Sequence, residues 1–263
     1  MKFNQALKMA LSALRANLGR SFLTMLGIII GVFAVTVLIS IVSSATDEMV
    51  SSIEGMGADL VTATWASPKR TYVTIDDLDE LLEDENIKAV ASATRGTSAT
   101  VKAGTEAETL SVMGITANYA DIQEQELGRG RFLSELDIEV HTNAAVIEYD
   151  TAIDFFMTDY VIGSKISIDG EEFEIVGVLK EQETGMGGQG SDTVYIPITT
   201  AQRMFENTEI SNIYVQATSS ETVDAATEAL EVYSKRIVKD EDYFYVYSNR
   251  ELPTILDDII GTL

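Results

Sequence analysis

The sequence contains no cysteine, which excludes disulfides, thiol catalysis, Cys-ligated zinc and a lipidated-cysteine anchor. It has one histidine, His141, in a polar section without a second imidazole nearby in sequence, and we interpret it as a surface residue. The patterns G-x-S-x-G, H-E-x-x-H and G-x-x-x-x-G-K-[ST] are absent as well. We therefore expect a non-catalytic protein with no metal and no cofactor.

Basic residues are scarce and unevenly distributed. The 263 residues include 18 Lys and Arg against 42 Asp and Glu, a formal net charge of −24. Residues 1–46 contain four basic residues and no acid, so the other 217 residues carry a net charge of −28. Such an acidic surface repels phosphate backbones, and we expect no nucleic acid partner. The basic start suits an anionic inner membrane leaflet.

A long uncharged run separates these two parts. Ser21 to Thr46 carry no formal charge, and the 21 residues from Phe22 to Val42 are the densest apolar part. As a helix they span roughly 31 Å, close to the hydrocarbon thickness of a bilayer. We predict a transmembrane helix over residues 20–46. A signal peptide cleaved after Ala45 is the alternative, but the 20-residue head and the apolar run are both long for one.

The flanking charges predict the orientation of this helix. The basic residues precede it, and Asp47 and Glu48 follow it. The positive-inside rule then places the N-terminus in the cytoplasm and the chain from about residue 47 outside the cell membrane. Residues 1–19 read as an amphipathic helix on the inner leaflet, with membrane lipid as its partner. Its apolar stripe consists of Phe3, Leu7, Ala10, Leu11, Leu14 and Leu18.

Small residues form one stripe within the apolar run. Gly27 and Gly31 make a G-x-x-x-G pattern, and Ala34 continues the small face by about one turn. Such a face permits close approach of a neighbouring helix. We predict that it is a packing face in the membrane.

The acidic part alternates strand-like and helix-like segments. Strand 59–66, a helix opened by the capping-box-like Thr74–Asp77 and short strands come first. A hairpin with an Asp169-Gly170 turn follows, then strand 212–217, helix 220–237 and strand 243–247. This predicts an α+β fold, in which two β-α-β halves flank a β-rich insertion. The predicted boundaries are 47–105 and 206–250 for the two halves, 106–205 for the insertion, and 251–263 for a final amphipathic helix.

The stretch Gly185-Met-Gly-Gly-Gln-Gly190 has the G-x-G-x-x-G spelling of a dinucleotide-binding turn. A nucleotide site needs a helix N-terminus after the glycines, but here the strand TVYIP follows. We interpret the stretch as a mobile loop between two strands, and as a candidate contact site for a substrate or a partner. Its residues are Gly185, Met186, Gly187, Gly188 and Gly190.

Several segments resemble, in order, the N-terminal half of MacB-like ABC transporter permeases, the MacB, FtsX and LolC type. They are RSFLTMLGIIIGVFAV, GADLV, GRGRFLSELDI, VIGSKISIDGEEFEIVGVLKE, DTVYIPITTAQRMF and NIYVQATSSETVDAA. The resemblance covers Arg20 to about Leu263 and is most specific from Gly163 to Phe205. It implies one transmembrane helix followed by an extracytoplasmic core domain with porter-like subdomain parts and an inserted sabre-like subdomain. Three further transmembrane helices of the family have no counterpart, so we expect the chain to be part of a longer permease.

The resemblance also implies a function and partners. A MacB-type permease couples ATP hydrolysis in a separate or fused nucleotide-binding domain to extracytoplasmic export of a peptide, drug or lipoprotein. The implied partners are an ABC ATPase subunit, a second permease copy and a membrane-fusion adaptor protein. Two alternatives remain open: an FtsX-like regulator of cell-wall enzymes, and a membrane-anchored receptor or adhesin whose acidic domain binds an extracellular ligand.

Overall fold

The structure is a computed structural model that describes residues 18–54, 59–65, 75–181, 192–206, 210–238 and 243–250. The chain divides into two compact units, Met1–Ser51 and Ser52–Leu263. The predicted inner-leaflet helix, the glycine-rich loop and the predicted final helix fall largely or entirely outside the described residues.

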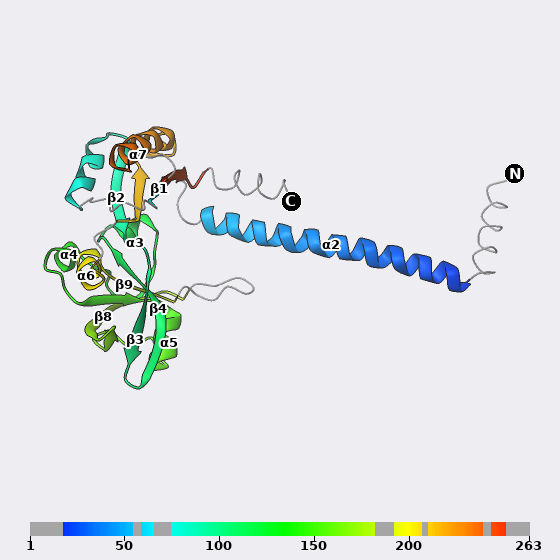
Figure 1. The fold of residues 1–263 in the computed structure, drawn as a ribbon, viewed down its shortest axis with the longest axis horizontal. Coiled ribbons are helices and arrows are strands. Elements are labelled where there is room, and N and C mark those ends of the chain that lie inside the picture. Colours follow the sequence, from blue (N-terminus) through cyan, green and yellow to red (C-terminus); the bar gives the residue numbers. More distant parts are fainter. Residues whose placement is uncertain are drawn as a thin grey trace. The chain divides into compact units, whose positions relative to one another are not determined.

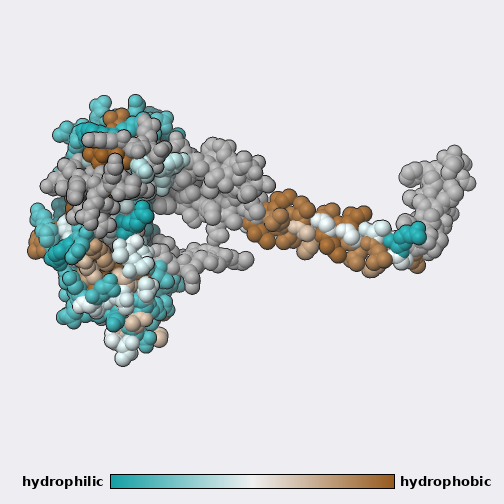
Figure 2. All heavy atoms as spheres, in the orientation of Figure 1, coloured by the Kyte–Doolittle hydropathy of each residue, from teal (hydrophilic) through white to brown (hydrophobic). Residues whose placement is uncertain are grey.

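The first unit is dominated by one helix, α2 (Leu18–Glu54). Its first 24 residues, Leu18–Ile41, have a mean hydropathy of 2.7 and are not buried within the chain, as a membrane-spanning segment requires. Figure 2 shows hydrophobic side chains along most of this stretch. The helix continues for 13 residues beyond Ile41, roughly 20 Å at 1.5 Å per residue.

The second unit contains a four-stranded antiparallel sheet in the order β11-β1-β10-β2. Its strands are β1 (Leu60–Trp65), β2 (Ile87–Ala93), β10 (Asn212–Ala217) and β11 (Phe244–Ser248). β10 lies between β1 and β2, and β1 lies between β10 and β11. The two predicted β-α-β halves therefore interleave, which gives a ferredoxin-like split β-α-β arrangement.

Two helical elements cover one face of this sheet. They are η1 (Asp76–Glu83) and α7 (Val223–Val238), and their apolar residues share a core with Val61, Ala63 and Ile213. α7 follows the predicted helix closely. The other predicted helix is a 3₁₀ helix instead, and no side-chain hydrogen bond caps its start at Ile75. Because 3₁₀ winding stacks residues three apart, Leu78 and Leu81 both face the core.

The insertion forms a ring of strands. Pairing runs β4-β3-β7-β8-β6-β9, and β9 pairs again with β4, so the sheet closes on itself. Figure 1 labels β3, β4, β8 and β9 of this subdomain. The strands are β3 (Thr97–Ala103), β4 (Glu106–Ile115), β6 (Ala144–Ile147), β7 (Lys165–Ile168), β8 (Glu171–Leu179) and β9 (Thr193–Pro197). A further strand, β5 (Leu127–Gly130), extends along β8. Because the ring is closed, each of these six strands has a hydrogen-bonded neighbour on both sides, and none of them is an edge strand where it is paired.

Short helices complete this subdomain. They are α3 (Tyr119–Ile122), α4 (Glu135–Glu139), α5 (Tyr149–Phe156) and α6 (Ile198–Met204). α6 lies so close to β4 that a Cβ on Gly114 would come within 2.5 Å of the Ala201 Cβ, so glycine is required there. The interior of the ring is filled by aliphatic side chains and Phe173, with Phe155 of α5 packed against it.

The predicted hairpin is confirmed, whereas the strand pairing shifts one subdomain boundary. β7 and β8 pair antiparallel across Asp169 and Gly170, which have φ values of 45° and 97°. Positive φ at both turn residues is what Asp-Gly favours in a two-residue hairpin. β3 precedes the predicted boundary at 105/106, yet it pairs only with β4 and β7. In hydrogen bonding the insertion therefore begins between β2 and β3.

Candidate functional site

The small-residue face lies on α2, as the sequence predicted. A Cβ added at Gly27 or Gly31 would meet nothing within 4 Å, and Ala34 is exposed. Nothing in the described part of the chain packs against this face. It is therefore open to another helix, since small residues let two backbones approach closely.

The candidate contact loop Gly185–Gly190 lies outside the described residues. Its surroundings match the prediction: β8 ends at Leu179 before the glycines, and β9 begins at Thr193 after them. β9 pairs in parallel with β4 and antiparallel with β6. The first described element after the glycines is thus a strand, and the contact role of the loop stays a prediction.

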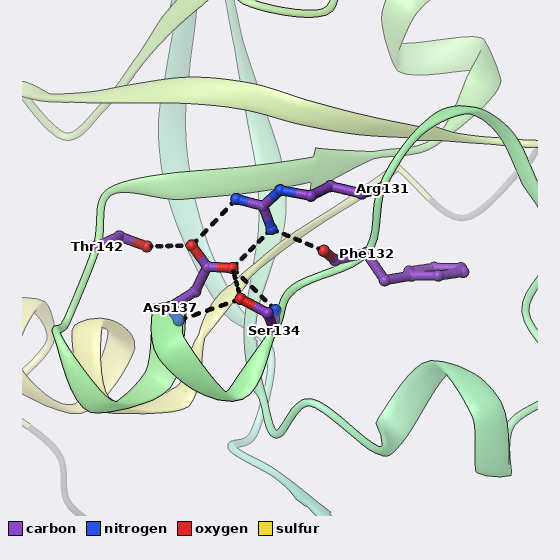
Figure 3. A network of polar contacts seen from close by, with 5 residues as sticks. All are labelled: Arg131, Phe132, Ser134, Asp137 and Thr142. Atoms are coloured by element: carbon purple, nitrogen blue, oxygen red, sulfur yellow. Dashed lines mark hydrogen bonds and ion pairs between the residues drawn. The ribbon is translucent and has the colours of Figure 1, made fainter.

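Asp137 is the centre of a buried polar network that the sequence analysis did not single out (Figure 3). Arg131 Nη1 and Nη2 donate to its two carboxylate oxygens at 2.6 and 3.2 Å, and Thr142 Oγ1 donates at 2.9 Å. The backbone N–H and the hydroxyl of Ser134 also donate, and the Ser134 side chain accepts from the Asp137 N–H, which completes a capping box. The S-x-x-D spacing at Ser134 was the available signal.

These contacts control the charge of Asp137. Burial raises the pKa of Asp137, but the hydrogen bonds from Arg131, Ser134 and Thr142 outweigh it and hold the pKa well below its usual range. The carboxylate therefore stays ionised and fixes α4 to the segment that follows β5. Its oxygens are occupied, so the network is a structural clamp and not an open site.

Glu148 is a second carboxylate of interest, half-buried at the N-cap of α5. Tyr195 Oη of β9 donates to its Oε1 at 3.1 Å. Burial raises the pKa of Glu148 to about 7; the Tyr195 hydrogen bond opposes the shift, and Asp150 and Asp192 add to it. No pattern in the sequence marks this residue, because the residues that desolvate it are distant along the chain.

A tyrosine cluster connects this carboxylate to the four-stranded sheet. The Tyr119 ring lies 6.0 Å from that of Tyr195 and 5.4 Å from that of Tyr214 on β10. Burial raises the pKa of Tyr119 to about 12, and it also raises the pKa of Tyr214. These rings belong to the apolar layer between the sheet and the ring of strands. The layer joins the two subdomains into one unit.

His141 is exposed, as expected, and lies beside a groove. It has a φ of 56°, and its Nδ1 is 3.0 Å from the Ile138 carbonyl oxygen. The groove has a volume of about 430 Å³ and lies between η1, β2, α4 and α6. Its lining residues are Ile75, Leu78, Asp79, Leu82, Val90, Ala91, Thr116, Ala117, Asn118, Glu135, Ile138, Glu139, His141 and Thr199. No group of three or more His, Cys, Asp or Glu among the described residues has metal-binding geometry.

The chain combines an apolar helix long enough to cross a membrane with a ferredoxin-like sheet that carries an inserted ring of strands. Residues 21–233 match the MacB-like periplasmic core domain. The chain belongs to this family, as the resemblance in its sequence predicted.

Curated relatives agree with this assignment. The chain is 28% identical over 259 residues to the macrolide export ATP-binding/permease protein MacB 1/2 of Paracoccus denitrificans, covering 95% of this chain and 39% of the relative. It is 31% identical over 219 residues to the macrolide export ATP-binding/permease protein MacB of Hyphomonas neptunium, covering 80% and 34%. The chain thus spans less than two fifths of the length of these relatives.

Two solved structures share the fold. The periplasmic region of MacB from Actinobacillus actinomycetemcomitans superposes with a TM-score of 0.64 at 20% identity, covering 78% of this chain and 96% of that one. The extracellular domain of the noncanonic ABC-type transporter YknZ from Gram-positive bacteria gives 0.60 at 20% identity, covering 72% and 100%. At this identity the likeness establishes the fold alone.

Proposed function

We propose that the chain is the N-terminal portion of the permease subunit of a MacB-type ABC transporter, which couples cytoplasmic ATP hydrolysis to export of a substrate outside the membrane. The observation that carries this proposal is the match of residues 21–233 to the family domain, with α2 leading into it. The chain is a non-catalytic part, and a nucleotide-binding subunit or domain hydrolyses ATP.

Continuity of α2 supports a mechanical role. The helix has no break between the apolar segment and Glu54, six residues before β1 begins. A continuous helix transmits axial and rotational displacement better than a flexible linker does, because each residue is held by its i→i−4 hydrogen bonds. Rearrangement of the membrane segments during the ATP cycle would thereby reach the extracytoplasmic domain.

The proposed orientation follows from the charges beside the span, with the N-terminus in the cytoplasm and the chain from about residue 47 outside. The proposed partners are an ABC ATPase, a second permease copy that contacts Gly27, Gly31 and Ala34, membrane lipid and an adaptor protein. Residues 47–105 and 206–250 would belong to the porter-like subdomain and 106–205 to the sabre-like one, with β3 added to the latter on its strand pairing.

The absence of cysteine allows a direct test of orientation. Lys8→Cys and Glu106→Cys each introduce a single thiol, one before the span and one on exposed β4. In intact cells without an outer membrane, or in spheroplasts, a membrane-impermeant maleimide should label the Glu106→Cys protein and not the Lys8→Cys protein. The reverse pattern would contradict the orientation.

Co-purification tests the transporter role. The tagged chain, or the longer protein that contains it, is isolated from mild detergent and searched by mass spectrometry for a protein with an ABC ATPase sequence. A permease of this type should recover such an ATPase in stoichiometric amount. Recovery of the protein without any ATPase, including one fused to it, would favour the receptor or adhesin alternative.

A further inference from the structure

The groove between the two subdomains has an apolar floor. Leu78 of η1 and Val90 of β2 are buried, with 4% and 8% of their surface exposed. Ile138 of α4 contributes from the opposite wall and packs partly against the same core. Leu82 is 46% exposed at the edge, so apolar surface remains accessible to a ligand. At about 430 Å³ the groove is in the usual size range of ligand sites.

The rim of the groove is anionic. Asp79 lies on η1, and Glu135 and Glu139 lie four residues apart on α4, which places them on one helix face. All three are exposed, and none forms an ion pair with a Lys or Arg in the described part of the chain. The lining includes no Lys or Arg. Among the described residues, the groove therefore has three carboxylates without an ion-pair partner around an apolar floor.

A second groove on the other side of η1 provides a contrast. Its volume is similar, about 440 Å³, and Glu80, Asp84 and Glu228 are its acidic residues. Here Arg236 donates to both carboxylate oxygens of Glu80 at 2.6 Å, and Asp84 accepts from the backbone and side chain of Asn86. Described residues satisfy two of these three carboxylates, whereas no described Lys or Arg forms an ion pair with a carboxylate at the rim of the first groove.

We propose that the groove lined by Leu78, Leu82 and Ile138 binds a short basic amphipathic peptide segment, with its apolar side chains on the floor and its Lys or Arg side chains at Asp79, Glu135 and Glu139. Because the carboxylates lie on two different elements, η1 and α4, at least two separate positive charges are needed to pair with both. A peptide supplies these charges at a fixed spacing along with apolar side chains, whereas an amine with one charge satisfies only one wall. This charge complementarity speeds the association of a basic peptide with the groove, and it disfavours the binding of acidic peptides.

The proposal does not depend on the export role, because binding needs no ATPase. The experiment uses the full chain in nanodiscs of neutral phosphatidylcholine, with empty nanodiscs as the blank. The probe is the fluorescein-labelled peptide Gly-Lys-Leu-Ser-Lys-Leu-Gly, and fluorescence anisotropy measures its Kd. Two matched peptides replace both Lys by Glu or both Leu by Ser.

Two variants test the two parts of the groove. Asp79→Asn/Glu135→Gln/Glu139→Gln should weaken binding about tenfold, as expected for loss of several exposed charge pairs. Leu82→Ser should weaken it several-fold by removing apolar contact. Glu106→Gln/Glu108→Gln/Glu171→Gln removes the same charge at exposed positions outside the groove and should change Kd less than twofold. All substitutions are at exposed side chains, and an unchanged circular dichroism spectrum verifies folding.

Four results would overturn the proposal. The first is no binding of the Lys/Leu peptide above the blank, and the second is equal loss of affinity in both triple variants, which would indicate general charge attraction. The third is an unchanged Kd for the Leu82→Ser protein or for the peptide in which Ser replaces both Leu. That result would mean that charge attraction at the surface explains binding without apolar contact in the groove. The fourth is displacement of the peptide by phenethylamine at equal concentration, which would make this a site for small amines.

Discussion

Tyr195 donates its hydroxyl hydrogen to Glu148 at 3.1 Å, and through this contact strand β9 holds the first residue before helix α5. The carboxylate has lost much of its hydration, and its pKa of about 7 lies far above the ordinary value of 4.5. Folding therefore favours the protonated form of Glu148. The stability of the domain should depend on pH in a range where most carboxylates no longer titrate.

The sign of this dependence follows from proton linkage. Since the folded pKa of Glu148 is raised, its stabilising contribution is present below pH 4.5 and is lost as the pH rises to about 7. We expect the free energy of unfolding to fall over that window by up to about 3 kcal/mol from this group. Glu148→Gln should remove this part of the pH dependence.

Urea unfolding at pH 4.5, 6 and 8 measures the effect, with Trp65 fluorescence as the probe. Trp65 is the single tryptophan, is 4% exposed, and donates from Nε1 to Ser234 Oγ at 3.1 Å. Glu106→Gln, at an exposed carboxylate on β4, is the control and should retain the wild-type slope. An identical slope in the Glu148→Gln protein would contradict the assignment.

Asp137→Asn should destabilise the domain by about 2 kcal/mol, because it leaves donors from Arg131, Ser134 and Thr142 around a neutral group. Arg131 is 53% exposed, so water compensates part of its loss and the effect stays below that of a fully buried ion pair. Ser134→Ala removes the cap and one hydroxyl donor to Asp137 but keeps Arg131 and Thr142, and it should cost about 1 kcal/mol. Denaturant midpoints at pH 7 compare the three proteins; equal stability of Asp137→Asn and wild type would show that the clamp contributes nothing.

Gly27→Leu and Gly31→Leu should each weaken helix packing in the membrane by filling the open face of α2. Ala34→Cys places a thiol on the same face, and oxidative crosslinking in membranes then reports the proximity of two copies. Ile29→Phe adds volume on the opposite side of the helix and is the matched control. Crosslinking yield that is unchanged by Leu at either glycine would rule out this face as a contact.

Residues 47–250 should fold without the membrane anchor, because the second unit contains its own cores on both faces of the sheet and inside the ring of strands. We expect a soluble acidic fragment with one cooperative thermal transition by circular dichroism and Trp65 fluorescence. A broad, non-cooperative melt would mean that the anchor is needed for folding.

Local features were predictable from the sequence, whereas long-range pairing was not. The apolar run of α2, the Asp169-Gly170 turn and the helix predicted over residues 220–237 each depend on neighbours within a few residues, and all three are confirmed. The alternation of strand-like and helix-like segments predicted the α+β class with a β-rich insertion, and the family resemblance implied the same division. Ring closure by β4 and β9 depends on residues about 80 positions apart, and no local pattern encodes it.

The candidate sites show the same difference between local features, which the sequence predicts, and features that depend on long-range packing. Gly27, Gly31 and Ala34 were predicted to share one helix face from spacing alone, since a helix face is a local property, and their contact role stays a prediction. Glu148 and the rim of the groove were missed, because burial of a carboxylate or the meeting of η1 with α4 depends on tertiary packing. The 3₁₀ form of residues 76–83 was also missed, since its apolar spacing fits an α-helix equally well.

The insertion begins and ends at directly paired residues. Ala93, the last residue of β2, and Asn212, the first of β10, are partners in the antiparallel ladder. Residues 94–211 therefore take the position of a hairpin loop between β2 and β10. Any segment inserted there would leave the sheet at Ala93 and return to it at Asn212. A short turn grafted between Ala93 and Asn212 should leave a minimal sheet with its two covering helices. The inserted ring is therefore attached to the sheet at one point of the ladder, while the sheet face that carries Leu60 and Ala91 depends on the ring for its burial.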